Sequence, residues 1–165
     1  MTRAKGPKFR LYPRRRRNGK TNYRKRLALV KGGKTRMVVR RSNRNVLVQF
    51  VDFTPTGDKT LLTLTSKELG KTHKWPVKRN TWTAYLTGLM AGKLAQKKGI
   101  KTFVLDMGRY VPSKGSVIFA ALKGVIDSGL ETSVENDKIP EDKISNPPDN
   151  YKGMFDEIKN KIMAG

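Results

Sequence analysis

Three short runs of β-branched and apolar residues stand in the first half of the chain. They cover residues 36–40, 45–53 and 60–65, and turn-forming residues separate them at positions 42–43 and 56–58. Consecutive runs of this kind with short links are typical of neighbouring strands. The pattern predicts an antiparallel meander of three strands.

Helical spacing of apolar residues dominates the part that follows. Residues 82–94 carry one apolar helical face, residues 102–105 form a short apolar run, and residues 116–126 carry a second helical face. This order predicts a helix, a strand and a second helix after the meander. The expected boundary signals are Asn80 or Thr81 with Gly99 for the first helix, and Ser116 with Gly129 for the second.

Two further features belong to this region. A loop that contains Gly70, Trp75 and Pro76 is expected to connect the third strand to the first helix. Gly88 and Gly92 have the spacing that lets a helix approach its neighbour closely. In a soluble helix this spacing predicts tight packing on the sheet.

The amino-terminal end has a different pattern. Residues 1–20 mix Gly and Pro with charged residues and have no hydrophobic period, so on their own they are expected to be extended and disordered. A short helix is expected next, because Thr21 or Asn22 can cap its start and residues 32–33 are glycines that can end it.

The carboxy-terminal end is acidic and contains prolines beyond residue 130. It finishes in an amphipathic stretch that predicts a helix. This helix either packs back on the chain's own body or docks on a partner protein, and the residues leave both interpretations open. Its apolar face consists of Tyr151, Met154, Phe155, Ile158 and Ile162.

The patterns together predict one α/β domain with two appendages. The mixed sheet begins with the antiparallel three-strand meander and continues with helix, strand and helix. An extended basic arm with a short helix spans residues 1–33, and the globular body spans residues 34–130. An acidic tail with a carboxy-terminal amphipathic helix spans residues 131–165.

Charge changes this picture most in the first third of the chain. Residues 1–51 contain 18 Lys and Arg and no Asp or Glu, within a chain of net charge +23. Like charges at this density repel one another, so the segment is suited to a polyanionic partner. The basic residues of the first strands, between residues 35 and 51, are expected to point outward from the folded body.

Aromatic residues interrupt the basic arm and favour RNA as that partner. Phe9, Tyr12 and Tyr23 supply flat rings for unstacked bases beside cations for phosphates. Arginine dominates the arm, and its planar fork pairs with phosphate and stacks on bases. No helix-turn-helix or zinc-finger pattern is visible that would read a duplex groove.

Several other classes are excluded by composition. The chain has no cysteine, and His73 is its only histidine, which excludes a disulfide framework, a cysteine zinc site and a Ser-His-Asp triad. Three Gly-Lys-Thr triplets lack the earlier glycine of a phosphate-binding P-loop. The apolar stretches are too short for a signal peptide or a membrane span, which predicts a soluble intracellular protein.

Two alternatives to RNA binding stay open at this point. One is a chromatin-like protein that binds duplex DNA through its phosphates. The other is a metal-dependent nuclease that uses Asp52, Glu68 and Asp106. Only four acids precede residue 127, so the loss of one to a turn or a helix cap would leave too few metal ligands.

The order of several residue blocks is more specific than any of these motifs. The blocks are Tyr12-Pro13 with the four arginines that follow, residues 19–27, Arg40-Arg41-Ser42-Asn43, residues 81–93, Leu105-Asp106-Met107-Gly108, Lys114-Gly115-Ser116 and residues 119–124. In this order they strongly resemble ribosomal protein L eighteen of the large subunit, in its archaeal and eukaryotic-like form. The resemblance covers roughly residues 6–140.

The resemblance implies a structural function without catalysis or cofactor. The family binds 5S ribosomal RNA in the central protuberance of the cytoplasmic ribosome and attaches it to the large-subunit RNA. Its body is similar in topology to the ribonuclease-H-like group. The implied partners are 5S RNA, large-subunit RNA and neighbouring ribosomal proteins. Candidate contacts to such a neighbour are Tyr151, Met154, Phe155 and Ile158.

The resemblance also assigns RNA-binding residues to the arm and, secondarily, to two loops. The predicted contacts of the arm are Lys5, Lys8, Phe9, Arg10, Tyr12, Arg14, Arg15, Arg16, Arg17, Lys20, Thr21, Asn22, Tyr23, Arg24, Lys25 and Arg26. The secondary candidates are Lys71, Lys74, Lys78, Arg79, Arg109, Tyr110, Lys114 and Ser116. The capped amino terminus of the helix after Ser116 is also suited to receive a phosphate.

Overall fold

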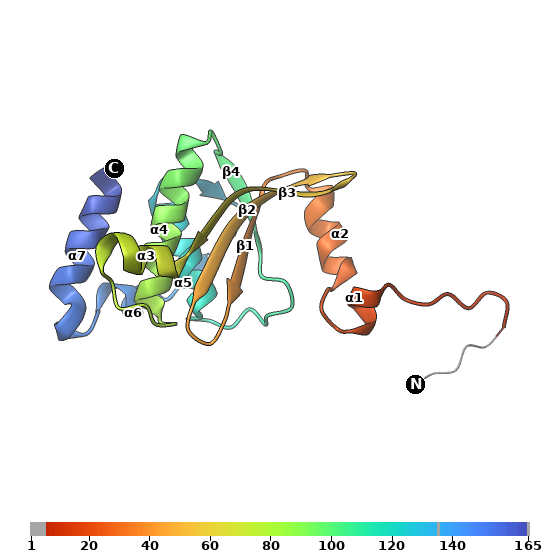
Figure 1. Cartoon of the computed structure of the whole chain (residues 1–165), viewed down its shortest axis with the longest axis horizontal. Coiled ribbons are helices and arrows are strands. Elements are labelled where there is room, and N and C mark those ends of the chain that lie inside the picture. Colours follow the sequence, from red (N-terminus) through yellow and green to blue (C-terminus); the bar gives the residue numbers. More distant parts are fainter. Residues whose placement is uncertain (1–5, 135, 165) are drawn as a thin grey trace.

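The computed structural model describes residues 6–134 and 136–164. Five strands form one sheet in the order β3-β2-β1-β4-β5 (Figure 1). The first three strands form antiparallel pairs, whereas β4 runs parallel to β1 and β5 runs parallel to β4. The strands are β1 (Arg36–Arg41), β2 (Val46–Thr54), β3 (Gly57–Thr65), β4 (Thr102–Asp106) and β5 (Glu131–Thr132).

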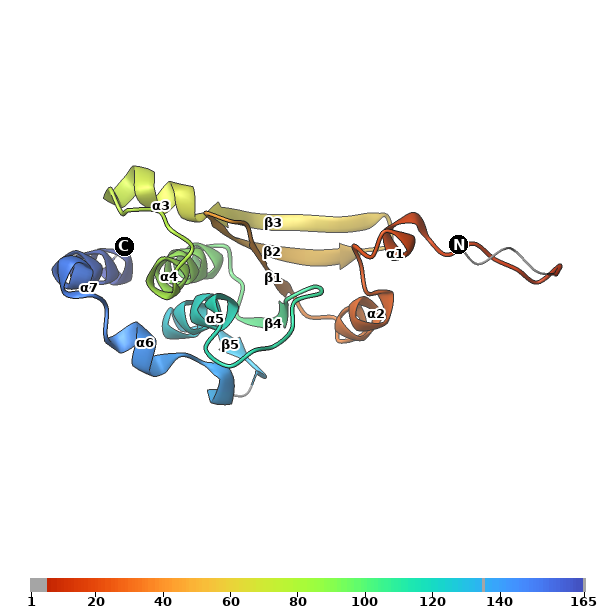
Figure 2. The same ribbon diagram turned by 90° about the horizontal axis from the view of Figure 1, so that it is seen from below.

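Two helices cover one face of this sheet, and a third helix lies behind them. Figure 2 shows α4 and α5 beside the strands and α7 on the far side of α4. The helices are α1 (Arg14–Arg17), α2 (Tyr23–Lys31), α3 (Ser66–His73), α4 (Thr81–Lys97), α5 (Val117–Asp127), the 3-10 turn Asn136–Lys138, α6 (Glu141–Ser145) and α7 (Asp149–Ala164). None of the helices in the described part of the chain is both long and apolar enough to cross a membrane.

The α/β fold with its antiparallel meander confirms the prediction from the sequence. The expected helix, strand and helix correspond to α4, β4 and α5. Asn22 caps α2 and Asn80 caps α4, each with a side-chain oxygen that accepts a backbone N–H. The similarity to the ribonuclease-H-like group stays a prediction.

Alternation along the strands separates an apolar face from a charged one. Met37 and Val39 of β1 are fully buried on the side of α4 and α5. Phe50 of β2 packs edge to face on Phe103 of β4, with the ring centroids 5.9 Å apart. Arg36 and Arg40, which alternate with Met37 and Val39, point to the opposite face because side chains alternate along a strand.

Four elements, as well as the 3-10 turn Asn136–Lys138, were not expected from the sequence. The segment expected to be a loop before α4 forms α3, which starts with a capping box between Thr65 and Glu68 and buries Leu69. The basic stretch at Arg14–Arg17 forms one helical turn instead of extended chain. Strand β5 and helix α6 are short elements that lack a clear period.

Gly88 and Gly92 permit close packing, but their neighbour is α5 and not the sheet, as had been expected. A methyl group at Gly88 would overlap the carbonyl oxygen of Ala121, and one at Gly92 would overlap the Ser128 hydroxyl. Helices α4 and α5 therefore approach each other closely at these positions, and at Gly88 they meet backbone to backbone.

The carboxy-terminal helix packs back on the chain's own body. Phe155 and Ile158 are buried, and the Phe155 ring lies 6.2 Å from Trp75 and 5.8 Å from Tyr85 between centroids. The prediction that these two side chains contact a neighbouring protein is therefore wrong. Tyr151 packs on Trp75, with the centroids 5.9 Å apart, and Met154 stays exposed.

Candidate nucleic-acid interface

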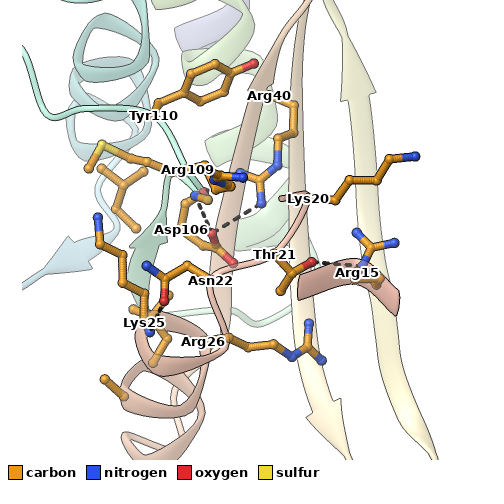
Figure 3. A pocket seen from close by; sticks show the side chains of 15 residues that line it. Arg15, Lys20, Thr21, Asn22, Lys25, Arg26, Arg40, Asp106, Arg109 and Tyr110 are labelled. Carbon is orange, nitrogen blue, oxygen red and sulfur yellow. Dashed lines mark hydrogen bonds and ion pairs between the residues drawn. The ribbon is translucent and has the colours of Figure 1, made fainter. Parts of the chain in front are cut away.

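The basic arm and the loop after β4 form the two walls of a groove of about 640 Å³. Figure 3 shows side chains from α1, α2 and their connection facing Arg40 of β1 and the segment from Asp106 to Tyr110. The groove brings together eight of the predicted RNA-binding residues from distant parts of the chain. They are Arg15, Lys20, Thr21, Asn22, Lys25, Arg26, Arg109 and Tyr110.

Local hydrogen bonds shape the wall that the arm contributes. The Pro13 carbonyl accepts the N–H of Arg16 at 2.9 Å and that of Arg17 at 3.1 Å, which starts the turn of α1. Arg15 Nε then donates to Thr21 Oγ1 at 2.8 Å. Gly19 reverses the chain at φ 63°, a conformation that favours glycine, and the Arg109 guanidinium passes directly against it.

The parallel pairing of β4 with β1 builds the opposite wall. It places Asp106 beside Val38, at the strand end where the chain turns. Asp106 Oδ1 accepts the N–H of Gly108 at 2.7 Å and Arg40 Nη2 at 3.2 Å. The Tyr110 hydroxyl donates to the Arg41 carbonyl at 3.0 Å, which ties the end of the loop to β1.

The groove has a strongly positive lining. Asp106 is the single acid among its lining residues, and it is already paired with Arg40 and Arg36. A concave surface lined by one sign of charge attracts oppositely charged ligands. The cations of the lining are Arg15, Lys20, Lys25, Arg26, Arg40 and Arg109.

Arg36 was expected to point outward, and this expectation is wrong. Its side chain is only 2% exposed and lies between two carboxylates. Arg36 Nη2 is 2.7 Å from Asp58 Oδ1, and Nη1 is 3.5 Å from Asp106 Oδ2. A buried guanidinium requires such partners because an unpaired charge in the interior is strongly unfavourable.

Asp58 connects this buried arginine to the arm. Its Oδ1 also lies 2.8 Å from Arg26 Nη2 of α2. Burial raises the pKa of Asp58, but the hydrogen bonds and charges of Arg36 and Arg26 outweigh burial, so its pKa lies below the ordinary 3.8. Sequence reasoning missed Arg36, Arg40 and Asp58 because β1, β3 and β4 bring them together only in the folded chain.

The three carboxylates considered as metal ligands of a nuclease, Asp52, Glu68 and Asp106, each have a separate structural partner. Asp52 on β2 accepts the Thr35 hydroxyl at 2.7 Å, Glu68 caps α3, and Asp106 is paired with arginines. Within residues 6–134 and 136–164, no cluster of three or more potential ligands of the His, Asp or Glu type is suited to a metal ion. The geometry therefore does not support the nuclease alternative.

The remaining arm residues lie beside the groove or beyond it. Arg16, Tyr23 and Arg24 line an adjoining hollow of about 430 Å³ with Arg109. The Arg16 guanidinium stacks over the Tyr12 ring at 3.8 Å from its centroid, so one face of this ring is already occupied. Lys5 lies outside the described residues. The predicted arm contacts that are exposed and line neither the groove nor this hollow are Lys8, Phe9, Arg10, Tyr12, Arg14 and Arg17.

The secondary candidates divide into separate places. Arg109 and Tyr110 join the groove, and Lys114 is exposed in the loop before α5. Ser116 occupies the N-cap position of α5, but its hydroxyl makes no capping bond and is buried. A further exposed group lies around α3, at the end of the molecule away from α2 (Figures 1 and 2). It consists of Lys71, Lys74, Lys78 and Arg79.

Comparison with known proteins agrees with the resemblance noted in the sequence. A family model described as ribosomal large subunit proteins 60S L5 and 50S L18 matches residues 7–103. The large ribosomal subunit protein uL18 of Saccharolobus islandicus is 41% identical over 167 residues, which cover 98% of this chain and 85% of that protein. The uL18 protein of Aeropyrum pernix is 46% identical over 141 residues, which cover 85% of this chain and 66% of that protein. The chain therefore belongs to this family of large-subunit ribosomal proteins, which are structural components and not enzymes.

Proposed function

We propose that this chain binds 5S ribosomal RNA and helps attach it to the large-subunit RNA in the central protuberance. The observation that carries the proposal is the positive groove between the arm and the segment after β4. Its cations come from α1, α2, β1 and the loop after β4, so it forms only in the folded chain. A polyanion satisfies these charges, and family membership identifies that polyanion as ribosomal RNA.

The groove and the extended stretch before it have different tasks in this proposal. Arginine and lysine side chains in the groove bind phosphates, and the arginine forks give two-point contacts. Phe9 and Tyr12 lie before α1 and are exposed, so they are available to stack on unpaired bases. Residues 1–33 act as the RNA-binding arm, whereas residues 34–130 and 131–165 form the body and the tail that carry it.

A charge-matched comparison of variants tests the proposal. Lys20→Gln and Arg109→Gln each remove one cation from the groove. Each is expected to weaken 5S RNA binding and to lower the slope of log K against log salt by about 1. Lys152→Gln removes the same charge from an exposed position on α7, at the opposite end of the molecule (Figures 1 and 2), and is expected to leave both quantities close to those of the wild type.

Competition with duplex DNA completes the test. The wild-type chain is expected to retain 5S RNA in the presence of excess duplex at physiological salt. Preference for the duplex would contradict the proposal and favour a chromatin-like function. Equal losses in the groove variants and in Lys152→Gln would show that the binding surface is not the groove.

A further inference from the structure

Helix α2 forms one wall of the groove, yet none of its residues is buried. Leu29 and Val30 are half-buried but do not belong to the hydrophobic core, so hydrophobic packing holds this nine-residue helix only weakly. Within the described part of the chain, one side-chain hydrogen bond joins α2 to the sheet. It runs from Arg26 Nη2 to Asp58 Oδ1 at 2.8 Å.

Asp58 is itself held in place by the strand that carries it and by an ion pair with the buried Arg36. It lies near the start of β3, where it pairs with Phe53 in the β2-β3 hairpin. The buried Arg36 approaches the same carboxylate oxygen at 2.7 Å, and it has little freedom to move because it is only 2% exposed. The carboxylate is therefore a fixed point to which Arg26 attaches the arm.

The same arginine reaches the opposite wall. Arg36 Nη1 lies 3.5 Å from Asp106, which in turn holds Arg40 and the backbone of Gly108. Five alternating charges thus connect α2 to the loop after β4. They run in the order Arg26, Asp58, Arg36, Asp106 and Arg40.

We propose that Asp58 is a positioning residue for RNA binding, which holds α2 through Arg26 so that both walls of the groove are in place before the RNA arrives. The inference rests on the function proposed above, because it concerns the same groove. Arg26 is then the exception among the cations of the groove, because it acts through its ion pair with Asp58 and not as a phosphate contact. A preformed groove loses less conformational entropy when it binds, which strengthens binding.

The direction in which one substitution changes RNA affinity separates this positioning role from a purely electrostatic effect. Asp58 is an anion beside a surface for a polyanion, so its removal should strengthen RNA binding if charge alone matters. If Asp58 positions α2, its removal should weaken binding although the net charge becomes more positive. The two explanations predict opposite changes for Asp58→Asn.

The experiment uses the full-length chain and two measurements. Hydrogen exchange of the α2 amides without RNA reports whether the helix is held, and 5S RNA titrations at several salt concentrations report binding. Asp58→Asn is expected to accelerate exchange across α2 and to weaken 5S RNA binding about tenfold. Arg26→Gln is expected to do the same, and the double variant is expected to add little further loss because the two residues form one pair.

Lys25→Gln is the matched control, since it removes a neighbouring cation of the same helix that also lines the groove. It is expected to reduce the slope of log K against log salt for RNA binding without changing the hydrogen exchange of the α2 amides. If Asp58→Asn does not fold, Arg26→Gln replaces it in the test, because the Arg26 side chain is 37% exposed and its loss is easier to tolerate.

Unchanged or tighter RNA binding by the folded Asp58→Asn variant would overturn the positioning role, whatever the rate of hydrogen exchange in α2. Failure of the wild-type chain to prefer 5S RNA would instead contradict the proposed function, while faster α2 exchange in Asp58→Asn would still support the attachment of α2.

Discussion

Gly88 of α4 and Gly124 of α5 lie against each other with no side chain between them. A methyl group on Gly124 would stand 3.1 Å from the backbone carbonyl carbon of Gly88 and would overlap the Tyr85 carbonyl oxygen. This contact between the two helices thus depends on the absence of a Cβ atom on both sides. This contact aligns the two helices that cover the sheet.

Substitution of either glycine by alanine is expected to destabilise the fold. Gly88→Ala and Gly124→Ala each force the helices apart, which should cost about 1–3 kcal/mol of unfolding free energy. Gly153→Ala in α7 is the matched control, because its added methyl group meets nothing within 4 Å. It should stabilise the protein by about 0.5–1 kcal/mol through helix propensity. Urea unfolding of the three variants measures these differences, and equal stability of all three would contradict the packing argument.

The attachment of the tail to the body predicts different effects for two neighbouring residues of α7. Phe155→Ala removes a buried ring between Trp75 and Tyr85 and is expected to cost about 3–5 kcal/mol. Met154→Ala removes a side chain that is 42% exposed and is expected to change stability by less than about 0.5 kcal/mol. Thermal or denaturant unfolding provides the measurement. A small effect of Phe155→Ala would mean that α7 is not part of the body's core.

The sequence predicted best those elements whose signal is local and repeated. The face from Trp82 to Leu94 extends over several helical turns. At each of the two N-caps the structure selects one of the two predicted candidates, Asn80 and Asn22. Helix α3 was missed although the Thr65 and Glu68 capping box stands in the sequence, because Leu69 is its only buried apolar residue. One apolar residue in two turns leaves no hydrophobic period to detect.

The sequence identified many of the residues that line the groove but not how they are arranged. It showed the charge of the arm, and Arg109 and Tyr110 were among the predicted RNA-binding residues. The position of Arg36 is not visible, because its burial depends on Asp58 and Asp106, which follow it by 22 and 70 residues. Only the pairing of β1 with β2 and β4, together with that of β2 with β3, brings these groups together.

The pKa of Asp58 leads to a prediction about stability in acid. Arg36 and Arg26 keep this pKa below 3.8 in the folded chain against the effect of burial, so the ionised carboxylate stabilises the native state above that pH. This contribution is expected to disappear as the pH falls through the lowered pKa. Urea unfolding of the wild type and Asp58→Asn at pH 6 and at pH 3 should show a stability difference that is large at pH 6 and smaller at pH 3. The same difference at both values would contradict the argument.

The contact between Tyr85 and Asp127 gives a complementary prediction for alkaline solution. The Tyr85 hydroxyl donates to Asp127 Oδ2 at 2.9 Å and joins α4 to α5. Burial raises the pKa of Tyr85 most, and the hydrogen bond to Asp127 and its negative charge raise it further above the ordinary 10.0. The neutral hydroxyl therefore stabilises the fold fully below pH 10, and this contribution is lost as the pH rises above that value toward the raised pKa.

Tyr85→Phe separates this effect from the ionisation of other groups. At pH 7 the substitution is expected to cost about 1 kcal/mol, because it removes one hydrogen bond and keeps the ring in place. Asp127 keeps its ion pair with Lys123 at 3.2 Å in the variant, so the remaining charge is not left alone. Between pH 9 and pH 11 the difference in unfolding free energy between the wild type and Tyr85→Phe should shrink, as measured by urea unfolding at each pH.

Tyr23→Phe is the control, because it changes an exposed ring and should stay within about 0.5 kcal/mol of the wild type at pH 7. A wild-type advantage that stays constant up to pH 11 would mean that Tyr85 is not held in its neutral form by burial and Asp127.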